Sequence, residues 1–148
     1  MPAEIKIEID SKKAINDLTA LALKIPQFML IPLRRAALWI VGQSQNKYLR
    51  GPSPQYLRKK SGRLRTSIGE ETKLEGKEVI AHIGTNVKSK RGFNYPGYWE
   101  DDGTGKGHGG PRPFLAPARD RDRGKWMSIF EKEFKVRLTQ WVKARSVR

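Results

Sequence analysis

Three consecutive acids, a histidine and a glycine-rich run lie together in WEDDGTGKGHGGPRPFLAPARD, residues 99–120. Two kinds of chemistry are conceivable there. The carboxylates of residues 100–102, with His108, could supply oxygen and nitrogen ligands to a metal ion. The glycines around Lys106 could cradle a phosphate. A third interpretation is that a loop leads into a rigid Pro-Phe-Leu-Pro anchor and performs no chemistry.

The residue spacing argues against both sites. A phosphate-binding loop needs Gly-Lys followed by Ser or Thr at the start of a helix. Here Gly107 follows Lys106, and Pro111 and Pro113 come before any helix. Consecutive acids on an extended chain point in different directions, so few of them can converge on one ion. We therefore expect no metal site and no cofactor.

Nucleophilic catalysis also has little support. With no cysteine and two histidines, a base–nucleophile pair would need His82, in an apolar strand, or His108, in a glycine-rich loop. We expect no catalytic residue and no enzyme activity. The remaining enzyme alternative is a metal-dependent nuclease that uses Glu100, Asp101 and Asp102.

The chain length predicts one domain, residues 1–148, with extended loops at about 51–60 and 85–112. No cysteine is available for disulfides. The N-terminus lacks a signal-peptide pattern, which fits a cytoplasmic origin. The most apolar run, 25–41, contains two prolines and two arginines. One arginine near a bilayer centre costs about 2.5–3.5 kcal/mol, so we expect a soluble protein that does not enter a membrane.

Alternating isoleucines predict a half-buried strand at residues 4–9. A helix with apolar residues at helical spacing follows, and Pro26 is expected to interrupt it. Pro32 suits the first turn of a second helix that extends to about residue 50. The N-terminal part is therefore expected to be a helical pair.

In the centre of the chain, the sequence predicts two antiparallel strands at about 68–74 and 78–84. The second strand is expected to be buried on both faces. Before them, Leu64 and Ile68 are expected to point inward. A further strand is expected through 95–99. The last helix begins near residue 117 and carries an apolar face of Trp126, Phe130, Phe134, Leu138 and Trp141. The predicted fold is α+β: a small antiparallel sheet packed with an N-terminal helical pair and a long C-terminal amphipathic helix.

Positive charge is the strongest compositional feature, with a net charge of +15. No acid occurs between Asp17 and Glu70. The basic residues of that stretch are Lys24, Arg34, Arg35, Lys47, Arg50, Arg58, Lys59, Lys60, Arg63 and Arg65. Such clustering is typical of contact with a polyanion, with an acidic protein, or of a solvated face. No motif for reading bases is present, and Tyr48, Tyr56 and Phe93 are too widely spaced to favour stacking on single strands.

Three short motifs, in this order, resemble those of the tail-completion or neck proteins of long-tailed bacteriophages. The first is SGRLRTSI at 61–68, and the second is Tyr98 with the acid-x-Gly-Thr element at 101–104. The third is PRPFLAPA at 111–118. The chain departs from the family pattern at Asp102, where an aromatic residue is common.

The resemblance implies a structural virion protein at the head–tail junction or upper tail, assembled in the host cytoplasm. It implies a homo-oligomeric ring around the DNA channel, with phage connector and tail proteins as partners and possible contact with packaged DNA. Residues expected to face DNA or an acidic partner are Arg58, Lys59, Lys60, Arg63, Arg65, Lys88, Lys90 and Arg91. Residues expected to anchor or dock subunits are Tyr98, Asp101, Gly103, Thr104, Arg112, Pro113, Phe114, Leu115 and Pro117.

Two alternatives remain open from the sequence. Prolines on both sides pre-set Phe114 and Leu115 in an extended conformation, which lowers the entropy lost when they dock. They could dock in a neighbouring subunit, or they could join the final helix to the sheet of their own subunit. A sequence-nonspecific nucleic-acid-binding protein is the alternative function.

Overall fold

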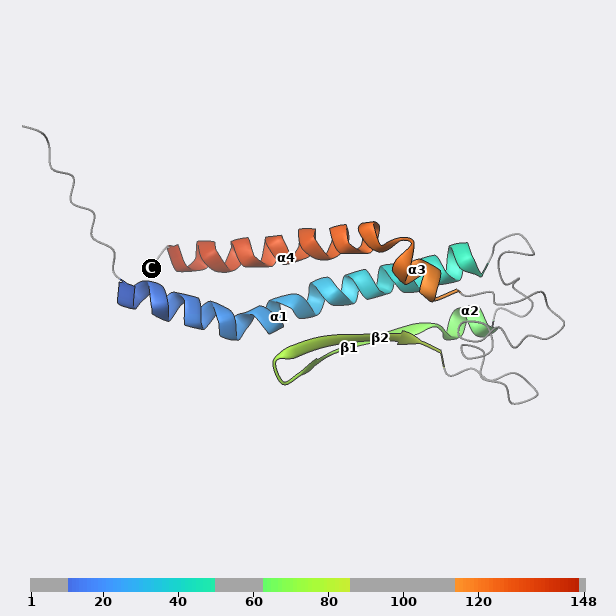
Figure 1. The fold of residues 1–148 in the computed structure, drawn as a ribbon, viewed down its shortest axis with the longest axis horizontal. Coiled ribbons are helices and arrows are strands. Elements are labelled where there is room, and N and C mark those ends of the chain that lie inside the picture. The colour runs from blue at the N-terminus through green and yellow to red at the C-terminus, as the bar shows by residue number, and fades with distance from the viewer. Residues whose placement is uncertain (1–10, 50–62, 86–113, 147–148) are drawn as a thin grey trace, which may run out of the picture.

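A computed structural model describes residues 11–49, 63–85 and 114–146 of the protein. Its elements follow in the order α1 (Ser11–Gln43), η1 (Ser44–Tyr48), α2 (Arg63–Ser67), β1 (Gly69–Glu75), β2 (Glu78–Gly84), α3 (Ala116–Asp120) and α4 (Arg123–Ser146). The fold is α+β, as the sequence predicts. The long helix α1 lies between α4 on one side and the β1–β2 hairpin on the other (Figure 1).

Helix α4 lies antiparallel along almost the whole of α1 (Figure 1). Near the start of α1, Asp17 forms an ion pair with Arg145, at 3.4 Å. Closer to its end, Arg35 binds Glu133. The predicted aromatic face of α4 is half buried, and its Trp141 contacts a phenylalanine of α1 edge to face. The amphipathic pattern therefore located the face of α4 that the fold uses.

The expected interruption at Pro26 is wrong, because α1 continues through both Pro26 and Pro32. A proline inside a helix removes one backbone hydrogen bond and crowds the preceding turn, and this can bend a helix without ending it. Figure 1 shows such a bend near the middle of α1. Packing against α4 on both sides of the bend stabilises the continuous helix, which replaces the expected helical pair.

The last helix begins where the sequence predicts, but it is divided. Helix α3 ends at Asp120, and α4 begins at Arg123 after a short turn. The expected burial of β2 on both faces is also wrong. No residue of β2 is fully buried and His82 is exposed, because a two-stranded sheet beside one helix has only one covered face.

The two strands form an antiparallel hairpin, as predicted, and the structure pairs Glu75 with Glu78 across a two-residue turn. Gly76 has a φ of 62° in this turn. No other residue that the structure describes has a positive φ. Type II′ turns place glycine at this first position because an L side chain is strained in that conformation.

Gly76→Ala is expected to lower the free energy of unfolding by about 1–2 kcal/mol, through backbone strain alone. A Cβ at Gly76 would meet nothing within 4 Å, so no steric clash contributes. Chemical denaturation measures the change. Gly76→Asn is the matched control, since asparagine tolerates a left-handed backbone. Its free energy of unfolding should fall clearly less than that of Gly76→Ala. Equal losses in the two variants would contradict the backbone argument.

The hydrophobic core lies at the end of α1 that is close to α2 and α3. Its buried members are Ile40, Val41, Tyr48, Leu49, Ile68, Phe114 and Ala118. Leu64 packs against this cluster and Ile68 is buried within it, which confirms their predicted inward orientation. The predicted strands at 4–9 and 95–99, and the loops at 51–60 and 86–112, lie outside the described residues.

Candidate functional site

Two distant segments of the chain meet around Tyr48 to form the candidate site. Ile68 ends the SGRLRTSI motif, and Phe114 lies within the PRPFLAPA motif. The side chain of Phe114 is fully buried in the same cluster as Ile68 and Tyr48. Leu115 packs against this cluster, and Pro117 is buried in the first turn of α3. The described part of the anchor therefore lies within the core of its own subunit.

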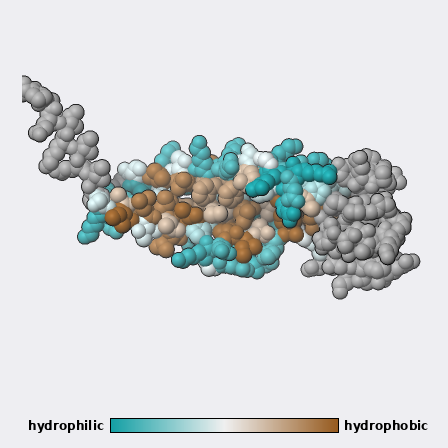
Figure 2. Space-filling view, in the orientation of Figure 1, coloured by the Kyte–Doolittle hydropathy of each residue, from teal (hydrophilic) through white to brown (hydrophobic). Residues whose placement is uncertain are grey.

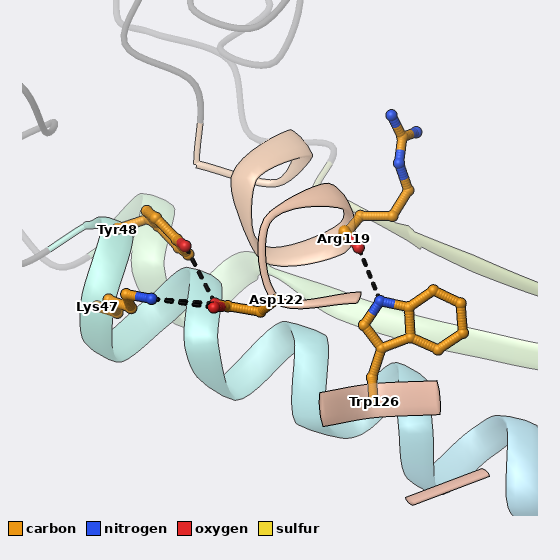
Figure 3. Close-up of polar contacts among 5 residues, drawn as sticks. All are labelled: Lys47, Tyr48, Arg119, Asp122 and Trp126. Carbon is orange, nitrogen blue, oxygen red and sulfur yellow. Dashed lines mark hydrogen bonds and ion pairs between the residues drawn. The ribbon is translucent and has the colours of Figure 1, made fainter. Parts of the chain in front are cut away.

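A polar cluster adjoins this core, where η1 meets the turn between α3 and α4 (Figure 3). Asp122 is 8% exposed, and its carboxylate accepts hydrogen bonds from two side chains. Tyr48 Oη donates to Oδ2 over 3.0 Å. Lys47 Nζ lies 3.1 Å from Oδ1 and 3.2 Å from Oδ2. These contacts connect the end of the first helix to the start of the last.

The charge on Asp122 depends on these two donors. Burial by itself raises the pKa of this carboxyl, because it penalises the charged form. The hydrogen bonds from Lys47 and Tyr48 act in the opposite direction and outweigh burial, so the pKa of Asp122 lies below its ordinary value. The side-chain hydrogen bonds to Tyr48 and Asp122 also raise the pKa of Lys47. The pair is therefore held in its charged form at neutral pH.

Backbone contacts fix the same turn. The amides of Lys125 and Trp126 donate to the carbonyl of Asp122, at 3.0 and 3.5 Å, and so begin α4. The indole Nε1 of Trp126 donates to the carbonyl of Arg119 over 2.7 Å (Figure 3). These hydrogen bonds fix the turn between α3 and α4. Arg121 is exposed on this turn, and Arg123 and Lys125 are exposed at the start of α4.

Of the predicted basic site, the structure describes Arg63 and Arg65, both on α2. Arg63 is exposed, and Arg65 is half buried and donates to Asn46 of η1. Arg34, another basic residue of the acid-free stretch, forms an ion pair with Glu70 at 2.9 Å, although its own side chain is 64% exposed. The other predicted basic residues, Arg58, Lys59, Lys60, Lys88, Lys90 and Arg91, lie outside the described residues.

The predicted anchor is described only in its second half. Tyr98, Asp101, Gly103, Thr104, Arg112 and Pro113 lie outside the described residues, as do Glu100, Asp102 and His108. Within residues 11–49, 63–85 and 114–146, no three His, Cys, Asp or Glu side chains are grouped so as to hold a metal ion. His82 lies exposed on β2, opposite Glu71.

Sequence reasoning missed the importance of Asp122. The alternating charges of residues 119–123 are typical of a solvated helix start, whereas the structure buries Asp122 and leaves its neighbours exposed. The sequence did contain one indication of this pairing. Because the chain has no acid between Asp17 and Glu70, any carboxylate that pairs with Lys47 must come from a distant segment.

The helical stretch Ser11–Tyr48 is long and apolar enough, by length and composition, to cross a membrane. The part of this stretch that meets the criterion has no residue buried inside the protein. The core helix of a soluble protein can meet the same criterion. Arg34 and Arg35, in the second half of α1, pair with Glu70 and Glu133 of neighbouring elements. The absence of a membrane-spanning segment remains a prediction.

Comparison of this chain with protein-family models, with curated proteins and with solved structures gave no match.

Proposed function

We propose that this protein is a structural virion protein of a tailed phage, at the head–tail junction or the upper end of the tail. Copies of it form a ring around the DNA channel and join the connector to the tail. The protein acts by binding, without a catalytic residue or a cofactor. It is assembled in the host cytoplasm and does not enter a membrane.

One observation carries this proposal. Two of the three resembling motifs, far apart in the chain, contribute Ile68 and Phe114 to one buried cluster. Motifs that cooperate in one core are more informative than short matches in unrelated parts of a fold. Their joint burial supports a common origin for the ordered set of motifs, and the family resemblance is what implies the virion role.

The charge distribution supports the expected partners. Arg121 is exposed on the turn before α4, and Arg123 and Lys125 are exposed in the first turn of α4. A ring would repeat this positive turn around its circumference. Repeated positive charge attracts packaged DNA or an acidic connector surface, and this attraction weakens as salt rises.

Replacing Arg58, Lys59 and Lys60 together with glutamate is expected to lower the yield of infectious particles at least tenfold, without unfolding the protein. The physical reason is the reversal of charge on the predicted partner-facing loop. Complementation of a gene-disrupted phage measures the yield, and circular dichroism checks the fold.

The matched control spreads the same charge change over three separate elements, with Lys12→Glu, Lys77→Glu and Lys132→Glu. All three lysines are exposed. The control should assemble nearly normally. An unchanged yield in the loop variant, or equal losses in both variants, would count against the partner-facing role.

Electron microscopy of lysates from the gene-disrupted parent phage tests the proposed role itself. Filled heads and finished tails lying unjoined would support a position at the junction. Free heads with overlong or absent tails would support a position in the upper tail. Normal infectious particles would refute the structural role.

The second candidate function is sequence-nonspecific binding of nucleic acid. The exposed Arg121, Arg123 and Lys125 favour it. If the isolated protein binds duplex DNA through phosphates, the logarithm of its affinity should fall with the logarithm of salt concentration by about 0.9 for each contact. A slope near zero would exclude this candidate.

A further inference from the structure

One apolar stripe runs the whole length of α1 but is covered only in its second half. Its members recur every three or four residues, the spacing of one helix face: Ile15, Leu18, Ala22, Pro26, Met29, Leu33, Ala36 and Ile40. Ala36 and Ile40 are 1% and 6% exposed. Ile15 and Leu18, at the other end, are 62% and 66% exposed.

The arrangement of the elements explains this difference. The hairpin lies beside the second half of α1 and does not reach its N-terminal half, where α4 is the neighbouring element (Figure 1). Figure 2 shows the resulting apolar surface over the start of α1 and the adjacent part of α4. Leu23, the residue after the stripe member Ala22, is also 69% exposed. Exposed apolar side chains in such a row mark a binding surface.

We propose that the N-terminal segment of this same chain, residues 4–10, folds back along α1 and covers the exposed half of the stripe. The segment has the matching pattern. Ile5, Ile7 and Ile9 alternate with charged residues, so an extended conformation places the three isoleucines on one side. The charged side then faces water while the isoleucines contact α1.

The length of the segment fits the surface. The stripe from Ile15 to Met29 extends about 21 Å at the helical rise per residue. Residues 4–10 span about 23 Å when extended. The segment joins α1 directly at Ser11, so a single reversal of the chain brings it onto the stripe. Binding within one chain also avoids the entropy lost when two molecules associate.

Charge favours this occupant over a second copy of the protein. Residues 4–10 carry three acids and one lysine. The surrounding surface is basic: residues 11–31 carry three lysines and one aspartate, and residues 134–146 of α4 carry four basic residues and no acid. A second copy would bring two such positive surfaces together, whereas the acidic segment neutralises one. This inference does not depend on the proposed virion role.

The absence of native cysteine allows a direct test. The variant Ile7→Cys with Ala22→Cys places one thiol on the apolar side of the segment and the other on the stripe. The full-length variant is oxidised with oxidised glutathione. We expect an intrachain disulfide that forms at least tenfold faster than in the control pair Lys6→Cys with Ala22→Cys, in which the first thiol faces water.

Gel mobility and peptide mass spectrometry distinguish the outcomes. A rapid intrachain disulfide in the first variant alone supports the proposal. A disulfide that joins two chains would show that a second copy covers the stripe and would overturn it. Equal oxidation rates in the two variants would show that the segment has no preferred side, and would also overturn it.

Hydrogen exchange gives a second, independent measurement on the full chain. Replacing Ile5, Ile7 and Ile9 with asparagine is expected to increase amide exchange at least tenfold across residues 11–29, because the covering segment is lost. The control replaces Glu4, Lys6 and Glu8 with glutamine and should keep the protection. Unchanged exchange in the hairpin, residues 69–84, confirms that both variants fold. Equal exchange across residues 11–29 in the two variants would refute the proposal.

Discussion

Replacing Phe114 with alanine is expected to lower the free energy of unfolding by about 3–5 kcal/mol, the range for truncating a buried aromatic residue. The ring is 0% exposed and belongs to the cluster that joins the end of α1 to α3. Its removal takes away apolar burial and leaves a cavity. Because prolines flank the anchor on both sides, its backbone has little freedom to close that cavity.

Denaturant titration of the isolated protein measures this loss. Phe114→Leu retains much of the apolar volume and should keep most of the stability. Val142→Ala is the matched surface control: it is 47% exposed on α4 and should change stability by about 0.5 kcal/mol or less. A Phe114→Ala variant that is fully stable alone but fails to assemble would instead place this ring in the pocket of a neighbouring subunit.

Asp122→Ala is expected to cost about 2–3 kcal/mol of stability. Loss of one partner from a fully buried ion pair typically costs about 3–5 kcal/mol. The expected loss is smaller here because the Lys47 side chain is 46% exposed and water can solvate its charge. The buried hydroxyl of Tyr48 also loses this acceptor. The substitution should therefore loosen the contact between η1 and the start of α4.

The pKa of Asp122 predicts how this contribution depends on pH. The group's folded pKa lies below its unfolded value, because the hydrogen bonds from Lys47 and Tyr48 outweigh its burial. Its contribution to stability is therefore fully present above the unfolded pKa, near 4, and is lost as the pH falls through the folded pKa. Asp122→Asn should reduce the acid-induced loss of stability, which unfolding measurements between about pH 7 and pH 2 would detect.

Asp120→Asn is the matched control for charge, two residues away. Its carboxylate forms an ion pair with Arg119 at 2.7 Å, but both side chains are exposed. Exposed pairs contribute little, so we expect a much smaller loss of stability than at Asp122. Equal losses at Asp120 and Asp122 would contradict the argument that burial makes the difference.

Local sequence patterns were sufficient to predict several elements of the fold. Alternation around a Gly-containing turn predicted both strands of the hairpin, and the spacing of aromatic residues predicted the inner face of α4. Leu64 and Ile68 were also correctly predicted to point inward. These patterns depend on residues close together in the chain, so each could be recognised without knowing its distant neighbours.

Other features could not be predicted in this way, because they depend on which distant segments pack against each element. Pro26 breaks the local hydrogen-bonding pattern, yet α1 continues because α4 packs along it. Asp122 is one of several alternating charges in the sequence, and it is buried because Lys47 and Tyr48 meet it in space. The regular stripe along α1 shows only that one face is apolar. The short hairpin covers its second half and leaves Ile15 and Leu18 exposed, because sheet length and placement are properties of the whole fold.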